Sequence, residues 1–245
     1  MKITFFTTST FSDIQETQSM CIRKLFPECN QIKFDGRKGW FSVWYSWLEY
    51  AKTYDSDWYV HIDEDCFITS REEIMNLIQE MIENGYDIAG PPDGYFEYRG
   101  GNNMALNSFF MIMNRKCIDA WHSRKNIPQF KEEWIEEYPF EKKGGVNYDY
   151  NMEFGSSGKP LGLIWKPCTE PYYDFMWVLK DAKIRFYYLE PGFGDEFQTT
   201  NLLNNTIIHM WHQRERWSES IVSPLHKTSN KSRFDGAIEK IKKTV

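Results

Sequence analysis

The sequence has no apolar run long enough to cross a bilayer, and its mean hydropathy is −0.60. Because a membrane-spanning helix needs about 20 mostly apolar residues, the sequence predicts a protein without a membrane span. The opening residues, MKITFFTTST, also lack the apolar stretch and cleavage site of a secretory signal peptide. From these absences we expect a cytoplasmic protein.

Cysteine and positive charge are scarce as well. The five cysteines never form a C-x-x-C pair, which favours free thiols in a reducing compartment over a disulfide framework. With 29 Lys and Arg against 35 Asp and Glu, the formal net charge is −6, which disfavours sequence-independent binding to nucleic acid. There is no G-x-G-x-x-G or Walker A sequence, so a dinucleotide-dependent dehydrogenase and a P-loop enzyme lose their main support.

Aromatic residues, by contrast, are abundant. Phe, Tyr and Trp make up 17% of the 245 residues. Because such side chains dominate burial in cores and interfaces, the chain is expected to fold around a hydrophobic core rather than to stay disordered. Its length favours one domain. Most aromatic residues of the second half are expected to pack in the core, and some could stack on a sugar.

The first 90 residues alternate between strand-like and helix-like patterns. A capping sequence at Ser70 and Glu73 opens a helix that Asn84 and Gly85 close. The alternation predicts an α/β fold, with a mixed but mostly parallel Rossmann-like sheet and helices on both faces. The expected strands cover residues 3–8, 31–35, 58–62 and 87–89, and the expected helices cover residues 13–25, 41–54 and 70–83.

The second half is more irregular. Residues 95–106 are rich in Gly and Asn and predict a loop, whereas residues 115–134 predict a helix with a break at Pro128. Residues 226–245 have a basic start and an apolar stripe, which predicts a surface helix or a partly ordered tail. Further strands are expected at residues 108–113, 161–165, 184–189 and 206–210.

An acidic cluster, Asp63-Glu64-Asp65, ends the β-rich run at residues 58–62. In open α/β sheets, ligands bind at the carboxyl ends of the parallel strands. If the strand continues, Asp63 and Asp65 lie on one face and Glu64 points away. Two carboxylates at this place favour Mg²⁺ or Mn²⁺, hard cations that take oxygen ligands and commonly bridge to a substrate phosphate. The alternative interpretation is a solvated acidic turn.

Residues 57–69, with their flanking helices, resemble the metal-binding centre of GT-A fold glycosyltransferases, in which an apolar strand ends in Asp-x-Asp. Residues 107–114 are similar to a strand of that family that begins Asn-Ser-Gly beside the sugar and acceptor pocket, with Phe109 in place of the usual Gly. Residues 207–217 are similar to a late segment of galactosyltransferase-like and glycogenin-like members, in which a His completes the metal shell. The chain lacks the Gly and the Lys-Pro pair of that segment but keeps its eight-residue spacing from His209 to a Trp.

The resemblance implies one GT-A-like domain over the whole chain, in which residues 1–94 bind a nucleotide sugar, residues 95–225 bind the acceptor and residues 226–245 form a C-terminal helix or tail. The implied activity is metal-dependent transfer of a hexosyl group from a nucleotide diphosphate sugar, with a UDP-sugar favoured. The implied acceptor is a glycan, a glycoprotein or a lipid-linked sugar, with a modified DNA base less favoured. The implied cofactor is Mn²⁺ or Mg²⁺, and its implied ligands are Asp63, Asp65, His209 and, as the alternative to His209, His212.

The resemblance also implies donor-binding residues near the same sheet edge. The family places the nucleobase and ribose just past the first strand, and a basic residue of the late segment contacts the diphosphate. After the second strand, cationic side chains and a Trp ring are suited to neutralising phosphate and stacking on a base. The complete set is Thr7, Thr8, Ser9, Asp35, Arg37, Lys38, Trp40, Asp63, Asn107, Ser108, Arg214 and Arg216.

Two carboxylates, Asp149 and Glu153, are the candidate catalytic residues. They lie on one face if this segment is helical. An inverting transferase needs a carboxylate that takes the proton from the attacking hydroxyl, and either residue can serve. Because a retaining transferase needs no such base at that place, both stereochemical outcomes stay open.

Two other functions are compatible with the same fold. A sugar nucleotidyltransferase makes a sugar nucleotide instead of consuming it. Such enzymes usually carry a Gly-rich basic loop after the first strand, whereas residues 7–13 contain neither Gly nor Lys nor Arg. A non-catalytic carbohydrate-binding protein of this fold would bind sugar whether or not metal is present.

Overall fold

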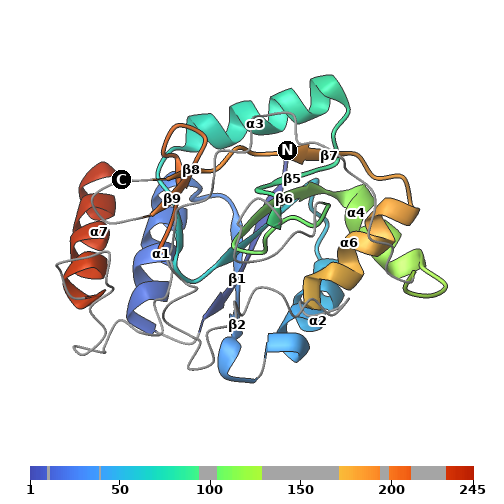
Figure 1. Cartoon of the computed structure of the whole chain (residues 1–245), viewed down its shortest axis with the longest axis horizontal. Helices are drawn as coiled ribbons and strands as arrows, with labels where there is room; N and C mark the ends of the chain where they lie inside the picture. The colour runs from blue at the N-terminus through green and yellow to red at the C-terminus, as the bar shows by residue number, and fades with distance from the viewer. Residues whose placement is uncertain (10–11, 39, 94–103, 129–170, 194–198, 211–229) are drawn as a thin grey trace, which may run out of the picture.

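A six-stranded sheet forms the centre of the protein, in the order β2-β1-β3-β6-β5-β7 (Figure 1). The computed structural model describes residues 1–9, 12–38, 40–93, 104–128, 171–193, 199–210 and 230–245. In this sheet β6 runs antiparallel to both neighbours and the other five strands share one direction, so the prediction of a mixed, mostly parallel sheet is confirmed. Its strands are β1 (Ile3–Ser9), β2 (Asn30–Asp35), β3 (Trp58–Asp63), β5 (Ile88–Gly90), β6 (Phe110–Asn114) and β7 (Phe186–Tyr188).

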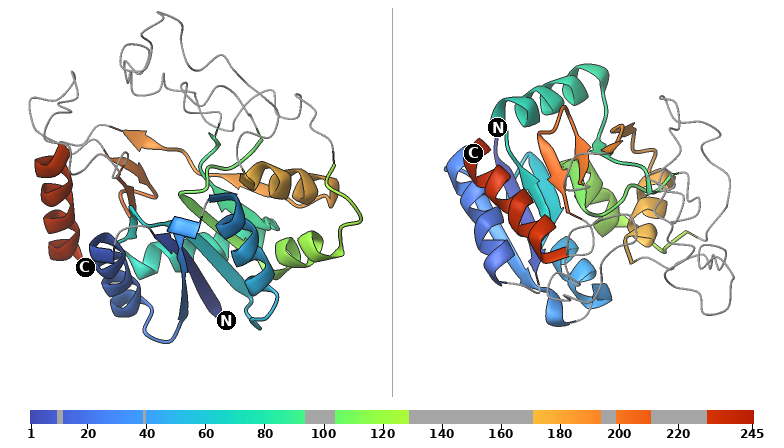
Figure 2. Two further views of the ribbon diagram at one scale, coloured as in Figure 1. Left: turned by 90° about the horizontal axis from the view of Figure 1, so that it is seen from below. Right: turned by 60° about the vertical axis from the view of Figure 1, so that its left-hand side comes forward.

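Helices cover both faces of this sheet (Figures 1 and 2). Those on one face bury Trp44, Trp47 and Trp121 in a shared aromatic cluster, and those on the other bury Phe26 and Ile78. Much of the aromatic excess therefore lies in the core. None of the helices in the described ranges is both long and apolar enough to cross a membrane. The first face carries α2 (Trp40–Ala51), α4 (Arg115–Ser123) and α6 (Pro171–Asp181), and the second carries α1 (Ser12–Leu25) and α3 (Arg71–Asn84).

Helix α3 begins and ends where the sequence predicts. The Ser70 hydroxyl accepts a hydrogen bond from the backbone N–H of Glu73 (3.4 Å), which satisfies a donor that the first turn leaves without a helical partner. Gly85 has φ 71°, a left-handed conformation that costs a side-chain-bearing residue strain, and its N–H donates to the Ile82 carbonyl (3.2 Å). A Cβ at this position would lie 2.8 Å from Nη1 of Arg185, so the glycine also makes room for that side chain.

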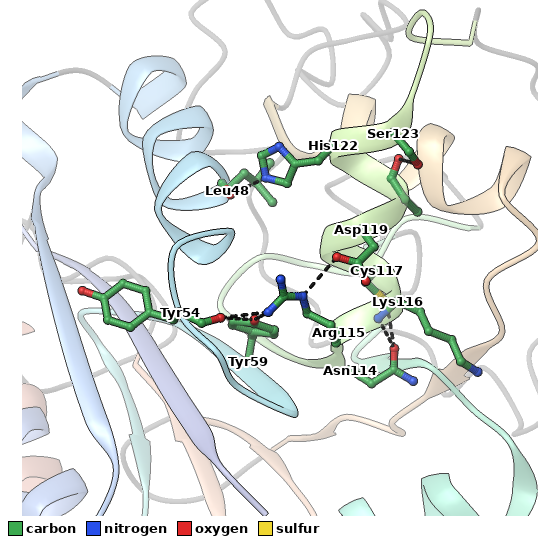
Figure 3. Close-up of polar contacts among 11 residues, drawn as sticks. Leu48, Tyr54, Tyr59, Asn114, Arg115, Lys116, Cys117, Asp119, His122 and Ser123 are labelled. Atoms are coloured by element: carbon green, nitrogen blue, oxygen red, sulfur yellow. Dashed lines mark hydrogen bonds and ion pairs between the residues drawn. The ribbon is translucent and has the colours of Figure 1, made fainter.

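Helix α4 is fastened to the sheet by Arg115 (Figure 3). The guanidinium donates through Nη1 to the Tyr54 carbonyl (2.9 Å) and the Tyr59 hydroxyl (3.1 Å), and through Nε to Asp119 (3.0 Å). The helix ends at Ser123, so the prediction that it continues is wrong for residues 124–128, and residues 129–134 lie outside the described ranges. Arg124, the residue after the helix, has extended backbone (φ −60°, ψ 142°). Pro128, four residues beyond Arg124, has no N–H to donate to the Arg124 carbonyl, and its ring would clash with that carbonyl in a continued helix.

A second, four-stranded antiparallel sheet has the order β4-β10-β9-β8. The sequence did not predict β4, since a strand of three residues carries too little pattern, and it also missed helix α6. The C-terminal segment forms α7 (Asn230–Thr244), which packs along α1 through Phe234, Ile238 and Ile241, so it is a packed helix and not a tail (Figure 1). The strands are β4 (Cys66–Ile68), β8 (Gly192–Phe193), β9 (Thr200–Leu202) and β10 (Ile207–His209).

The described cysteines are free thiols, as predicted: Cys21, Cys29, Cys66 and Cys117. Burial raises the pKa of Cys21 to about 11 and raises the pKa values of Cys66 and Cys117 well above the ordinary value. These three thiols are therefore neutral at physiological pH and behave as small apolar side chains.

His61 on β3 is buried between Trp44 and Trp47, and its Nδ1 lies 2.9 Å from the Ser108 carbonyl. Burial lowers the pKa of His61 to about 4, against the opposing effect of the Ser108 carbonyl. The unfolded chain binds the proton near the ordinary pKa of 6.5, whereas the folded chain binds it only near 4. We therefore expect the free energy of unfolding to fall by about 3 kcal/mol between pH 6.5 and pH 4, at about 1.4 kcal/mol for each pKa unit.

Urea unfolding of the metal-free protein, measured across this pH range, tests the expectation. The comparison is His61→Leu, which keeps every other titrating group. The variant should be less stable at pH 7 and should lose less stability on acidification than the native chain does. Parallel pH profiles for the two proteins would show that His61 is not the group responsible.

Candidate metal and donor site

Asp65 and His209 lie side by side, although they come from distant parts of the chain. The Asp65 Oδ1 is 3.3 Å from the His209 Nε2, and the two side chains are only 12% and 5% exposed. Strand β3 ends at Asp63, and residues 64 and 65 form a turn into β4. Because the strand does not continue through Asp65, the alternation that would put Asp63 and Asp65 on one face does not apply.

Backbone pairing explains why the two side chains meet. Strand β10 runs antiparallel to β4, with His209 opposite Cys66. The Met210 N–H donates to the Asp65 carbonyl (2.9 Å), which extends the pairing by one residue into the acidic turn. The contact between Asp65 and His209 is thus a product of register between two short strands.

Gln18 on α1 is hydrogen-bonded to the backbone of the acidic turn. Its Nε2 donates to the Asp63 carbonyl (2.5 Å) and to the Cys66 carbonyl (2.8 Å), so one amide group holds both ends of the turn. The Gln18 side chain is fully buried. Sequence reasoning missed this residue, because a glutamine inside an amphipathic helix carries no signal of a distant partner.

The donor atoms of this pair suit a divalent cation. A carboxylate oxygen and an imidazole nitrogen are a ligand set that Mn²⁺ accepts, and a cation of this kind often takes only one or two carboxylates from the protein and completes its shell with water and substrate phosphate. Within the described part of the chain, no group of three or more His, Cys, Asp and Glu side chains is placed to hold a metal. Asp65 and His209 could thus supply two ligands to a cation at this place.

Several predicted donor-binding residues meet at the same sheet edge. Thr8 lies opposite Asp63 in the pairing of β1 with β3, and Ser9 lies opposite Asp35 in the pairing of β1 with β2. Thr7 is buried, and its hydroxyl accepts a hydrogen bond from the Gln31 side chain (3.4 Å). The carboxyl ends of three parallel strands thus bring their polar residues together, as the topology predicts.

Other predicted donor residues are bonded to protein groups. Arg37 donates to both carboxylate oxygens of Asp35 (2.8 and 2.9 Å), and this partner raises the pKa of the Arg37 guanidinium. Asn107 donates from Nδ2 to Asp93 (2.7 Å), and the Ser108 carbonyl lies against His61. Asn107 and Ser108, which precede β6, therefore bond to buried protein groups beside the site.

The side chains of some predicted site residues are not described. Lys38 ends the 3-10 helix η1 (Gly36–Lys38) and Trp40 begins α2, and only their backbone is described. The other residues lie wholly outside the described ranges and stay predictions: Asp149, Glu153, His212, Arg214 and Arg216.

Comparison with known proteins relates the fold to solved structures. No protein-family model and no curated protein matches the sequence. A glycosyltransferase involved in the glycosylation of the major capsid of PBCV-1 superposes with a TM-score of 0.52 at 9% identity, over 98% of this chain and 100% of that chain. A197 from STIV superposes with a TM-score of 0.47 at 14% identity, over 86% of this chain and 94% of that chain, too loosely to add to the argument. From the match to the PBCV-1 protein, together with the sheet order and the helices on both faces, the fold of this chain is GT-A-like.

Proposed function

We propose that this chain transfers a glycosyl group from a nucleotide diphosphate sugar to an acceptor hydroxyl, with Mn²⁺ or Mg²⁺ as cofactor. The observation that carries the proposal is the contact of Asp65 with His209 at the ligand-binding edge of a GT-A-like sheet. The likeness in fold to a glycosyltransferase, over 98% of this chain and 100% of that chain, supports it.

In this proposal Asp65 and His209 hold the cation, and Asp63, at the end of the neighbouring strand, faces the donor. Bound there, the cation supplies electrostatic stabilisation for the negative charge that develops on the departing diphosphate. Asp65 and His209 are mostly buried, so they are pre-oriented and shielded from bulk water, which strengthens their interaction with a charged ligand.

The rest of the proposed machinery follows the sequence predictions. Residues 1–94 bind the nucleotide part of a hexosyl donor, for which a UDP-sugar is favoured, and residues 95–225 bind the acceptor. Arg214 or Arg216 assists at the diphosphate, and Asp149 takes the proton of the acceptor hydroxyl or positions it. The acceptor class comprises glycans, glycoproteins and lipid-linked sugars.

Purified protein, Mn²⁺ and a panel of nucleotide sugars test the proposal. We expect one donor, supplied at about 100 times its Kd, to stabilise the fold by about 2.7 kcal/mol in thermal unfolding. The same donor should be hydrolysed slowly to free nucleotide diphosphate, and EDTA should abolish both effects. Failure of every nucleotide to bind in the presence of Mn²⁺ would refute the proposal.

Two further outcomes distinguish the alternatives. Release of pyrophosphate from a nucleoside triphosphate and a sugar phosphate would overturn glycosyl transfer in favour of nucleotidyl transfer. Sugar binding that is unaffected by EDTA, without hydrolysis of any donor, would overturn it in favour of a carbohydrate-binding protein.

A further inference from the structure

Phe109 contacts both halves of the candidate site. Its ring lies flat on the imidazole of His209, with the ring centroids 4.1 Å apart and the planes inclined by 5°. Its carbonyl accepts a hydrogen bond from the Asp63 N–H (3.0 Å). Because Asp63 ends β3 and His209 ends β10, this one residue joins the six-stranded sheet to the four-stranded sheet at the site.

Phe109 is itself held in place. It is fully buried, and its N–H donates to the side-chain oxygen of Asn107 (3.2 Å). Asn107 is in turn fixed by Asp93, to which its Nδ2 donates (2.7 Å). The aromatic ring therefore presents a rigid flat surface to His209.

This flat surface restricts rotation of the His209 ring, the motion that would turn its nitrogen away from a metal. The torsion that turns a His ring about its own axis is broad, so a carboxylate at one edge leaves the ring free to tilt. Tilting the His209 ring would drive its edge into Phe109 at a centroid separation of only 4.1 Å. The stack thus keeps the edge of the ring that carries Nε2 beside Asp65.

We propose that Phe109 is a positioning residue for His209, which fixes the imidazole plane for metal binding through its stacked ring. The inference rests on the proposed function, since it takes His209 as a metal ligand. Hydrogen-bonding groups that orient a metal-bound His typically contribute 10-fold to 100-fold to metal affinity, and we expect the stacked ring to contribute at the lower end of this range.

Phe109→Leu tests the proposal, because leucine keeps an apolar side chain but removes the aromatic ring. Mn²⁺ affinity, measured by electron paramagnetic resonance of the free ion in the absence of any nucleotide, should fall by about 10-fold or more. Phe109→Met, which fills the space more flexibly, should show the same loss if Phe109→Leu does not fold. The matched control is Phe5→Leu, which should leave the affinity unchanged. The Phe5 ring is fully buried as well, but its centroid lies 5.1 Å from that of Phe26.

A second measurement needs no metal. The ring current of Phe109 should shift the His209 ring-proton NMR signals upfield in the metal-free protein, and this shift should disappear in Phe109→Leu but persist in Phe5→Leu. Wild-type Mn²⁺ affinity in both Phe109 variants would overturn the positioning role and leave the proposed function standing. Absence of Mn²⁺ binding by the native chain both without and with nucleotide would instead overturn the proposed function, and the positioning role for metal with it.

Discussion

Replacing Asp65 with asparagine is expected to lower metal-dependent turnover of the donor by a factor on the order of 100 or more, since a bound cation supplies several kcal/mol of transition-state stabilisation. Asparagine matches aspartate in size but carries no negative charge, and its amide oxygen is a weaker ligand. Since Asp65 lies 3.3 Å from His209, the change removes one of two neighbouring donor groups. Mn²⁺ affinity and steady-state hydrolysis of the nucleotide sugar should fall together.

The control for this variant is Asp55→Asn, which makes the same change in net charge at a distant place. The Asp55 side chain is 92% exposed and pairs with Lys2 (2.7 Å). An exposed pair of this kind contributes little, so turnover and Mn²⁺ affinity should stay within about twofold of the native values. If Asp65→Asn behaves like Asp55→Asn while the native protein turns the donor over, Asp65 is not a metal ligand.

Local features such as helix caps could be predicted from the sequence, because the residues that interact in them lie within a few positions of each other. The Ser70 cap of α3 spans three residues, and Gly85 ends the helix by its own backbone conformation. The alternation of strands and helices in the first 90 residues could also be predicted, because each element has its own local pattern of apolar residues. That alternation in turn predicts the mostly parallel central sheet. The helix end was predicted too late, because a proline disfavours a helix back to the carbonyl of the residue four positions before it, which here is Arg124.

That Asp65 and His209 belong to one site was implied only by the resemblance to GT-A fold glycosyltransferases. Nothing in the spacing of Asp65 and His209 places them together, since their contact depends on the register of β4 with β10. The sequence did not predict which residues support the site, although the resemblance singled out Phe109 as a departure. Gln18, Phe109 and Asp93 act through partners on other elements, and a glutamine in a helix or an aspartate in a Pro-Gly turn has the same local pattern whether or not it is buried.

The largest loss of stability is expected from Asp93→Ala. Asp93 is fully buried just past β5, and its carboxyl group accepts hydrogen bonds from Asn107 (2.7 Å), from Tyr172 (3.2 Å) and from Tyr173. Alanine would leave three buried donors without this acceptor and a small cavity besides. A buried donor left unsatisfied costs about 1–3 kcal/mol, so we expect a loss of about 3–5 kcal/mol in the free energy of unfolding.

Chemical denaturation of two comparison variants separates this network from a general effect of losing a carboxylate. Asp119→Ala makes the same truncation at a side chain that is 63% exposed and paired with Arg115, and it should cost less than about 1 kcal/mol. Tyr173→Phe removes one donor but keeps Asp93 and its other partners, so it should cost about 1–2 kcal/mol. A cost for Asp93→Ala no larger than that for Asp119→Ala would mean that water replaces the carboxyl group. In that case Asp93 would not be what ties α6 to the segment that carries Asn107 and Phe109.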